Sequence, residues 1–313
     1  MNLGVTDRLE PILNSVKAFI QDKVQPVDEE FLAEVDNGDR WTLNERQAEI
    51  LEGLKAEARE QGLWNFWLTD SDRGPGLTTV EYAKIAEHTG RAHIAAECFN
   101  CSAPDTGNME VLERYGSAAQ KSAWLEPLLS GEIRSAYAMS EPGVASSDAT
   151  NIAMSAELQD GHWVLNGEKT YISGAGDKRC KILICMVKTN PENARHQQHS
   201  QILVPMDTPG VEVLRPMGVF SMDEAPHGHL HLKFTDVRVP EDHFILGPGR
   251  GFEVAQGRLG PGRIHHCMRA IGMAEEALER MCQRAVSRTA FGKPLAKLGG
   301  NYDKIANARM AID

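Results

Sequence analysis

The sequence predicts a multidomain α+β protein in which helices come first, strands follow and helices return. The spacing of apolar residues predicts this order, because it changes from about 3.6 residues to about 2 near residue 133 and changes back after Pro240. Length supports it, since 313 residues are roughly twice the usual size of one domain. We therefore predict an α-helical domain over 1–132, a β-barrel or sandwich domain over 133–241 and a partial helical bundle over 242–313.

Four helices are expected in the first domain, each with apolar residues at helical spacing. Each begins at a pair of residues that matches the capping box, in which two side chains satisfy each other's backbone N–H groups. Gly62 and Gly90 stand where glycines that end helices belong. The four pairs are Asp7 with Glu10, Thr42 with Glu45, Thr78 with Glu81, and Ser117 with Gln120.

Several strands are expected in the second domain, separated by Gly, Pro, Asn and Asp turns. The pair Asn166–Gly167 predicts a hairpin turn between two short strands. On the last strand, His229, His231 and Lys233 should face solvent while the apolar residues between them face the core. The predicted strands cover 133–139, 152–158, 162–172, 180–187, 201–205, 211–214 and 228–239.

The third region carries an apolar stripe from Phe252 to Val286, which predicts one long helix. We expect a break in this helix at Gly260-Pro261-Gly262, because proline removes a backbone donor and clashes with the preceding turn. A second helix is expected from Tyr302 onward, and no cap or stop signal precedes Asp313. The chain is therefore expected to end inside a helix.

Composition excludes several classes of protein. Lys and Arg number 33 against 44 Asp and Glu, a net charge of −11 that repels nucleic acid. No apolar run approaches the roughly 18 to 20 residues that span a bilayer, and the N-terminus lacks a signal-peptide pattern. Six cysteines fit a reducing compartment. We expect a cytoplasmic protein without a transmembrane segment.

Two groups of residues suggest metal binding, and each has a simpler explanation. Cys98 and Cys101 form one CxxC pair, which fits buried free thiols as well as a metal or redox site. The histidines at 227, 229 and 231 fit the solvent face of a strand as well as a metal site. His265 and His266 are adjacent on a helix and should point in different directions. We expect no metal.

Three stretches could carry chemistry, although each also fits an ordinary structural role. Tyr137–Asp148 runs from a strand into a loop that could bind a planar ligand or a phosphate, or form a well-bonded turn. Lys169–Gly176 places an aromatic residue at a strand end before small residues, which suits a flat ring system or a hairpin exit. Gly257–Arg263 places two guanidinium groups near a helix interruption, which suits anions. Rossmann, P-loop and nucleophile-elbow motifs are missing from the sequence.

Taken in order, five motifs resemble the acyl-CoA dehydrogenase family over the whole chain. The resemblance implies an N-terminal helical domain, a middle β domain and a C-terminal four-helix bundle, here incomplete. Two further segments, 103–112 and 256–268, resemble one subgroup, whose animal members join this unit to a kinase-like domain. No kinase-like domain is present in this sequence. The five motifs are Tyr137–Asp148, Leu165–Ser173, Phe234–Pro240, Gly249–Phe252 and Arg288–Gly292.

The resemblance also implies roles for individual residues. FAD would be lined by Tyr137, Met139 and Ser140, and its ring would be flanked by Tyr171, Ile172 and Ser173. Ser146 would lie between the flavin and the substrate, and Gly260, Pro261, Gly262 and Arg263 would contact acyl-CoA. Arg288 and Phe291 would reach the FAD of a neighbouring subunit. The protein should then be a homodimer or homotetramer.

The implied reaction is α,β-dehydrogenation of an acyl-CoA thioester, as in fatty-acid β-oxidation, with electrons passed to an electron-transferring flavoprotein. The resemblance places the usual catalytic base, a carboxylate, beyond Asp313, and some relatives carry it at the position of Gly262. Leu298 and Gly299 depart from a His-Gln pair that contacts the neighbour's FAD in many relatives. The 313-residue form should therefore bind FAD weakly and lack turnover. A flavin oxidase of the same fold and a catalytically silent acyl-CoA-binding protein are the alternatives.

Overall fold

The computed structural model describes residues 4–69 and 73–313. The chain divides into two compact units. One comprises residues 1–29, 51–99 and 263–313, and the other comprises residues 30–50 and 100–262. The change from helices to strands falls where the sequence predicts it, since the first strand begins at Arg134. The domain boundaries at 132 and 241 stay predictions.

The first unit is built mainly from helices. Phe99 lies at its centre, with ring centroids 5.4 Å from Phe19 and 5.8 Å from Phe66, and all three side chains are buried. Three helices, α2 (Gln25–Ala33), α3 (Glu45–Glu60) and α9 (Gly251–Ser287), have residues in both units. The other elements of this unit are α1 (Leu9–Phe19), a π-helical turn (Ile20–Val24), α4 (Thr79–Thr89), α5 (Ala95–Cys98), the hairpin β8 (Thr289–Ala290) with β9 (Lys293–Pro294), and α10 (Asn301–Ile312).

Two glycines bring α4 and α9 into close contact. A Cβ atom at Gly272 on α9 would lie 1.7 Å from the backbone oxygen of Glu87, and one at Gly90 would lie 2.1 Å from that of Arg269. No side chain fits at such distances. Gly90 ends α4 as predicted, and its close packing adds a second reason for glycine.

Two of the four predicted capping boxes are confirmed. Thr78 with Glu81 caps α4. Ser117 with Gln120 caps the segment that contains α7 (Ala118–Gln120), a π-helical turn (Lys121–Leu125) and α8 (Glu126–Leu129). The box of Asp7 with Glu10 is wrong, because Arg8 precedes α1 without a side-chain cap.

The predicted box of Thr42 with Glu45 is also wrong. Thr42 donates its hydroxyl proton to Asp39 at 2.7 Å, and α3 begins only at Glu45. Asn44 and Gln47 form the reciprocal bonds instead, with Oδ1 of Asn44 accepting from the Gln47 N–H at 2.8 Å. Two overlapping patterns therefore compete, and the one adjoining the helix forms the cap.

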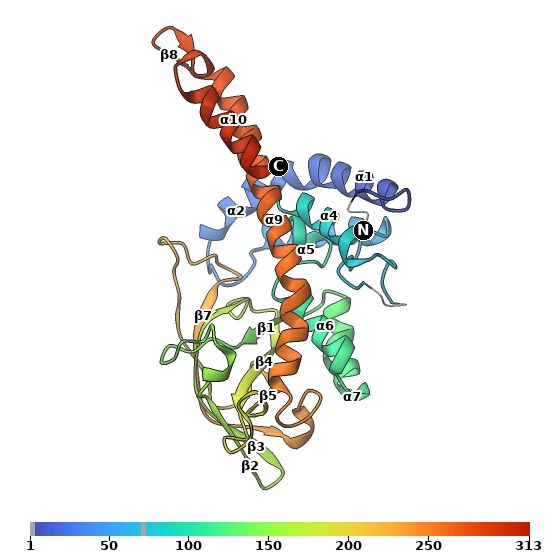
Figure 1. The fold of residues 1–313 in the computed structure, drawn as a ribbon, viewed down its shortest axis with the longest axis vertical. Helices are drawn as coiled ribbons and strands as arrows, with labels where there is room; N and C mark the ends of the chain where they lie inside the picture. Colours follow the sequence, from blue (N-terminus) through green and yellow to red (C-terminus); the bar gives the residue numbers. More distant parts are fainter. Residues whose placement is uncertain (1–3, 70–72) are drawn as a thin grey trace. The chain divides into compact units, whose positions relative to one another are not determined.

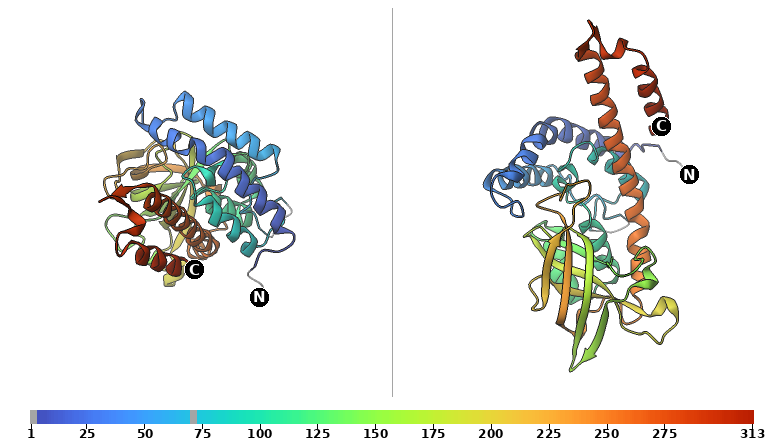
Figure 2. Two further views of the ribbon diagram at one scale, coloured as in Figure 1. Left: turned by 90° about the horizontal axis from the view of Figure 1, so that it is seen from above. Right: turned by 90° about the vertical axis from the view of Figure 1, so that its left-hand side faces the viewer.

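The second unit is built around a seven-stranded sheet. Its strand order is β1-β4-β2-β3-β7-β6, with β5 paired to the other edge of β4, and Figure 2 shows these strands side by side. Only β1 with β4 and a single pair between β2 and β4 are parallel. The strands are β1 (Arg134–Ala138), β2 (Ser155–Gln159), β3 (His162–Ser173), β4 (Cys180–Lys188), β5 (His199–Pro205), β6 (Val211–Pro216) and β7 (His229–Pro240). All seven predicted strands are confirmed.

The predicted hairpin turn at Asn166–Gly167 is wrong. Both residues lie inside β3, where the register with β7 shifts between Leu165 and Gly167. A Cβ at Gly167 would lie 2.8 Å from the Met154 side chain, so this glycine marks a bulge and a close approach. The turn lies at Asp160 and Gly161, whose φ angles of +52° and +73° join β2 to β3.

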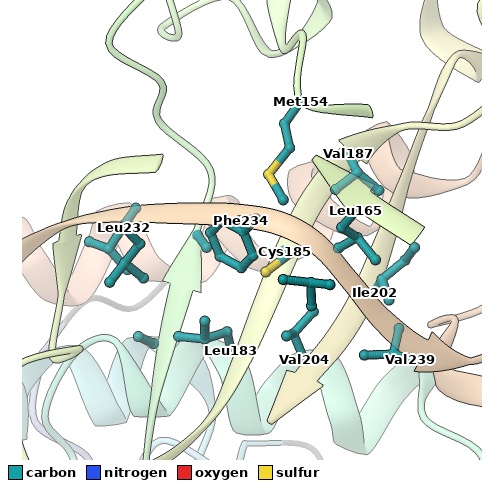
Figure 3. Packing of buried hydrophobic residues seen from close by; sticks show 14 of the residues in the cluster. Met154, Leu165, Leu183, Cys185, Val187, Ile202, Val204, Leu232, Phe234 and Val239 are labelled. Atoms are coloured by element: carbon teal, nitrogen blue, oxygen red, sulfur yellow. The ribbon is translucent and has the colours of Figure 1, made fainter. Parts of the chain in front are cut away.

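The largest buried cluster of this unit is built on the sheet, and a smaller cluster includes Met186 of β4, which is buried along nearly its whole length. Apolar side chains from several strands gather in the largest cluster, as Figure 3 shows for Phe234, Cys185 and Val204. On β7 the buried residues Leu230, Leu232 and Phe234 alternate with more exposed neighbours. The predicted division of this strand into a core face and a solvent face is confirmed.

The predicted break in the long helix is wrong. α9 runs without interruption from Gly251 to Ser287 with Pro261 inside it, as the orange ribbon in Figure 1 shows. Pro261 removes one backbone donor but does not end the helix, so its effect is limited to the turn of the helix in which it lies. The helix predicted near the end is confirmed as α10, and α6 (Asp105–Tyr115) is a helix that the sequence analysis missed.

The histidines and cysteines considered as metal ligands make other contacts or are buried. His229 pairs with Glu224 at 3.0 Å, and His231 pairs with Glu168 at 2.9 Å. The side chains of His265 and His266 are stacked, with ring centroids 5.4 Å apart, so the prediction that they diverge is wrong. Cys98 and Cys101 are both buried. Within residues 4–69 and 73–313, no cluster of metal-ligating side chains exists, and no helix is long and apolar enough to cross a membrane.

Candidate functional site

Two predicted segments meet in the second unit, one after β1 and one at the end of β3. The backbone N–H of Thr170 donates to the carbonyl of Ser140 at 2.9 Å, and Lys169 Nζ donates to the carbonyl of Met139 at 3.0 Å. These bonds place the segment of Tyr137, Met139 and Ser140 beside the segment of Tyr171, Ile172 and Ser173. The structure thus brings together six residues that the sequence predicted from two separate motifs.

A bulge in β3 turns Tyr171 outward. The register between β3 and β7 shifts between Lys169 and Ile172, and Tyr171 has a φ of +54°, which non-glycine residues rarely adopt. Lys169 and Ile172 are buried while Tyr171 is 49% exposed. Bulges re-aim side chains beside functional sites, and this one presents an aromatic ring at the surface next to the Met139–Ser140 backbone.

Ser146 closes the loop that follows β1. Its Oγ accepts a bond from the backbone N–H of Glu141 at 2.7 Å and donates to carbonyls of the same loop. At the other end of the loop, Asp148 accepts from the N–H and hydroxyl of Thr150 at 3.0 and 2.6 Å. The loop is therefore ordered by its own side chains, and Ser146 lies directly beside the Met139–Ser140 segment.

Ser173 is held from the opposite side. Its hydroxyl is 2.8 Å from Nδ1 of His229, whose Nε2 is 3.0 Å from the Glu224 carboxylate. This chain of three polar groups fixes the Ser173 side chain at the end of β3, while Ile172 beside it is only 1% exposed. Ile172 therefore contributes backbone and packing at the site and not an exposed side chain.

Arg258 on α9 is one of the two guanidinium groups that the sequence analysis expected to suit anions, and the structure stacks it on Tyr137 instead. Its guanidinium lies over the ring of Tyr137, 3.9 Å from the centroid, and its Nε donates to Asn108 at 3.1 Å. No carboxylate of the described residues forms an ion pair with it. Burial lowers the pKa of Arg258 from its ordinary value, an effect that Tyr137 and nearby carboxylates oppose. The signal was present in the Gly257–Arg263 stretch, which contains this guanidinium.

Tyr137 is fixed by this stacking and by its hydroxyl. Gln201 Nε2 donates to the Tyr137 hydroxyl at 2.9 Å and to the carbonyl of Gly251 at 3.0 Å. Burial raises the pKa of Tyr137 to about 12, although the Arg258 charge opposes the shift. Tyr137 therefore stays neutral at physiological pH and cannot act as an anion or a base there.

The remaining predicted residues lie on α9 and on the hairpin that follows it. Gly260, Pro261 and Gly262 continue α9 directly after Arg258, and Arg263 is exposed. Arg288 and Phe291 belong to the first unit, where Phe291 lies in the turn between β8 and β9 with a φ of +51° and 94% exposure.

A pocket of about 520 Å³ lies elsewhere in the second unit. Trp41, Trp124 and Met206 contribute to its apolar wall, and Lys178 and Asp207 contribute charge. None of the residues predicted to contact FAD or acyl-CoA lines it, although Ala175 and Gly176 at the end of the Lys169–Gly176 stretch do. We place the candidate site at the strand ends and not in this pocket, because the strand ends combine an outward ring with backbone and hydroxyl groups.

The strand ends fit a planar, polar cofactor such as a flavin. A half-exposed aromatic ring offers a stacking surface, and the neighbouring loop supplies hydroxyl and backbone groups at fixed positions. The chain provides binding and orientation of this kind, whereas a redox-active side chain is not among the groups that meet there. The arrangement therefore suits cofactor-borne chemistry.

Comparison with known proteins gives a consistent result. The N-terminal, middle and C-terminal domain models of acyl-CoA dehydrogenase match residues 6–132, 136–236 and 249–313. A protein of Mycobacterium abscessus, whose solved structure is assigned to the acyl-CoA dehydrogenases, superposes with a TM-score of 0.94 at 50% identity. This comparison covers 99% of this chain and 77% of that one.

Two curated relatives show the same similarity over part of their length. Acyl-CoA dehydrogenase family member 10 of Mus musculus is 50% identical over 99% of this chain and 29% of its own length. The Mycobacterium tuberculosis protein named Probable acyl-CoA dehydrogenase FadE2 is 51% identical over 84% of this chain and 64% of its own length. The chain thus spans between 29% and 39% of the first several curated relatives that it matches.

Proposed function

Because the chain belongs to the acyl-CoA dehydrogenase family, we propose that it holds FAD at the joined ends of β1 and β3 and dehydrogenates an acyl-CoA thioester between its α and β carbons. One observation carries this proposal. The Thr170–Ser140 bond joins the two predicted flavin segments, and the bulge at Tyr171 presents a ring beside them. FAD is the cofactor, and when bound it would supply the redox chemistry of the reaction, as the acceptor of the substrate hydride.

The chain's own residues bind and orient the reactants. We assign the backbone of Met139 and the backbone and hydroxyl of Ser140 to the flavin, and Tyr171 to one side of its ring. Ser146, fixed by its bonds within the loop, would face both cofactor and substrate. Gly260–Gly262 on α9 would contact the acyl-CoA, together with the exposed Arg263. We assign no residue of this chain as the base that removes the α-proton.

We also propose that Arg288 and Phe291 complete the cofactor site of a neighbouring subunit. The exposure of Phe291 at the tip of a hairpin supports this role, because its ring is accessible for a contact with a neighbouring subunit. Phe291→Ala should weaken FAD binding and oligomer formation, whereas Met310→Ala, which alters another exposed apolar residue, should change neither. Analytical ultracentrifugation with flavin titration tests both variants.

Tyr171 allows a direct test of the cofactor site. Tyr171→Ala should raise the dissociation constant for FAD about tenfold, equivalent to roughly 1.4 kcal/mol, because the stacking surface is lost. Leu158→Ala is the matched control, since Leu158 is 47% exposed and also lies on a strand of this sheet. Equal FAD affinity in the two variants would contradict the proposed site.

Anaerobic reduction tests the reaction itself. A form extended past Asp313, where the resemblance places the usual base, is loaded with FAD and titrated with short-, medium- and long-chain acyl-CoAs. Bleaching of its visible flavin band is expected with at least one of them, whereas the 313-residue form should not be reduced. The electron acceptor we propose is an electron-transferring flavoprotein, in a pathway of the β-oxidation type. Rapid oxygen consumption would favour the oxidase alternative, and an unbleached flavin would favour a silent acyl-CoA-binding protein.

A further inference from the structure

A buried ion pair lies behind the strand ends of the proposed site. Lys169 on β3 has no exposed surface and Glu141 after β1 is 8% exposed, and Lys169 Nζ is 2.8 Å from Glu141 Oε1. Isolated buried charges are strongly unfavourable, so such groups persist only when they are paired and hydrogen-bonded. The pair therefore needs an account of what it holds in place.

Every hydrogen-bonding position of the Lys169 ammonium is used. Besides Glu141, it donates to the carbonyls of Met139 at 3.0 Å and Met186 at 2.6 Å. Three bonds match the three donors of an ammonium group. Burial lowers the pKa of Lys169, and the Glu141 carboxylate opposes that shift. One side chain thus fastens the backbone after β1 to the interior of β4.

Glu141 fastens a further segment. Its two carboxylate oxygens accept from the backbone N–H groups of Ala153 at 2.8 Å and Met154 at 2.9 Å, where the chain returns from the loop that contains Ser146. Its own N–H donates to Ser146 Oγ. Glu141 therefore joins the start of the Ser146 loop to its end at Ala153 and Met154, and Lys169 in turn bonds to Glu141.

The residues adjoining Lys169 form the rest of the site. Thr170 bonds to Ser140 at 2.9 Å, and the strained bulge at Tyr171 follows directly. A residue at positive φ persists only where its surroundings determine it. The ion pair lies on the buried side of this bulge, next to the backbone that would face the cofactor.

We propose that Lys169 and Glu141 are positioning residues for the cofactor site. They touch neither FAD nor substrate, but they hold the Met139–Ser140 backbone, the Ser146 loop and the Tyr171 bulge in the geometry that binds the flavin. This inference rests on the proposed function, and it adds that FAD affinity depends on a charge pair hidden beneath the site.

The test uses three variants and a matched control in the full chain. Glu141→Gln and Lys169→Met each leave one charge without its partner, so either variant could lose stability for that reason alone. The double variant E141Q/K169M removes both charges and should regain stability relative to the single variants. Glu168→Gln is the control, because Glu168 is the preceding residue on β3 but pairs with His231 at the partly exposed face.

The readouts are the dissociation constant for FAD, the visible circular dichroism of the bound flavin, and the melting temperature of the protein without FAD. In E141Q/K169M we expect the dissociation constant for FAD to rise at least about tenfold, which corresponds to roughly 1.4 kcal/mol of lost binding free energy. We also expect the visible circular dichroism of the bound flavin to change. The melting temperature should exceed that of either single variant, and E168Q should match the wild type in all three.

Recovery of wild-type FAD affinity in the double variant would overturn the proposal, since the pair would then contribute only to stability. The same conclusion follows if FAD affinity falls strictly in proportion to melting temperature across the series. These readouts do not involve turnover. A form extended past Asp313 that binds FAD but is not reduced by acyl-CoA would contradict the proposed reaction while leaving this inference intact.

Discussion

Glu81 offers the sharpest test of the energetics of the first unit. Its carboxylate accepts bonds from the guanidinium of Arg8, from the Thr6 hydroxyl at 2.7 Å and from the Thr78 backbone N–H at 2.9 Å. The side chain is buried. The Arg8 hydrogen bond is the largest of the influences that lower the pKa of Glu81 from 4.5 to about 2, against an opposing effect of burial.

The magnitude follows from this shift. One pKa unit corresponds to about 1.4 kcal/mol, so the ionised Glu81 contributes about 3 kcal/mol to folding. Because the pKa of this carboxyl group is lowered in the folded state, stability should fall as the pH falls. The contribution is complete above pH 4.5 and is lost as the pH falls toward about 2, because the folded state must then be protonated at a carboxylate that it holds ionised. Glu81→Gln should remove this pH dependence along with the stability.

Urea denaturation of the wild type and Glu81→Gln at a series of pH values provides the assay. We expect a difference of about 3 kcal/mol at pH 7 that shrinks progressively below about pH 4.5. Glu10→Gln is the control, because Glu10 is exposed and caps nothing. A difference between wild type and Glu81→Gln that stays constant between about pH 7 and pH 3 would refute this account of the site.

Three further predictions concern packing and buried polar groups. Gly272→Ala should lower stability by about 1 to 3 kcal/mol, because its Cβ would lie 1.7 Å from a backbone oxygen of α4. Gly53→Ala, in open space on α3, should instead raise stability by about 0.5 to 1 kcal/mol. Thermal melts measure both changes. Gln120→Ala should cost about 1 to 3 kcal/mol by urea denaturation, because its amide donates to two backbone carbonyls at 2.8 and 2.6 Å. Arg134→Met, which breaks a buried pair at 2.6 Å, should cost about 3 to 5 kcal/mol. Arg258→Met should cost less, about 1 to 3 kcal/mol, since no ion pair within the described part of the chain is broken but the buried Asn108 loses a donor; equal losses by urea denaturation would count against this distinction.

Periodicity predicted strands such as β7 well because β7 has one buried face. Residues such as Leu230, Leu232 and Phe234 alternate with polar neighbours, and that alternation is visible in the sequence without any knowledge of pairing. The Asn166–Gly167 error has a different origin. An Asn-Gly pair favours a hairpin turn locally, but twelve residues from His162 to Ser173 pair as one strand, and the glycine serves the bulge instead.

Helix ends were harder to predict because capping motifs overlap. Thr42 and Asn44 both precede a suitable partner by three positions, and only the position of the first helical turn decides between them. Pro261 was misjudged for a related reason. The rule that proline breaks helices describes its local cost, whereas packing along a helix of 37 residues can exceed that cost. The residues nearest the motif therefore do not determine which residue caps α3 or whether α9 continues through Pro261.

The site shows which features a single sequence reveals. The order of the motifs carried the family resemblance that predicts flavin contacts for Tyr137, Ser140 and Tyr171, and these contacts stay predictions. Lys169 was read only as the start of a stretch, since nothing in the sequence shows that its ammonium is buried beside Glu141, 28 residues earlier. That pairing depends on β1 and β3 lying side by side, which is a property of the fold.

The same reasoning explains why the exposed and buried parts of the site should respond differently to substitution. Tyr171 is 49% exposed and packs against little, so its removal should weaken ligand binding with little effect on stability. Lys169 is fully buried with three partners, so its removal should affect both. A site whose ligand-facing groups are mostly backbone must be shaped by the side chains behind it, because a carbonyl or N–H can be moved only by moving the chain that carries it. In this protein the buried pair of Lys169 and Glu141 occupies that position.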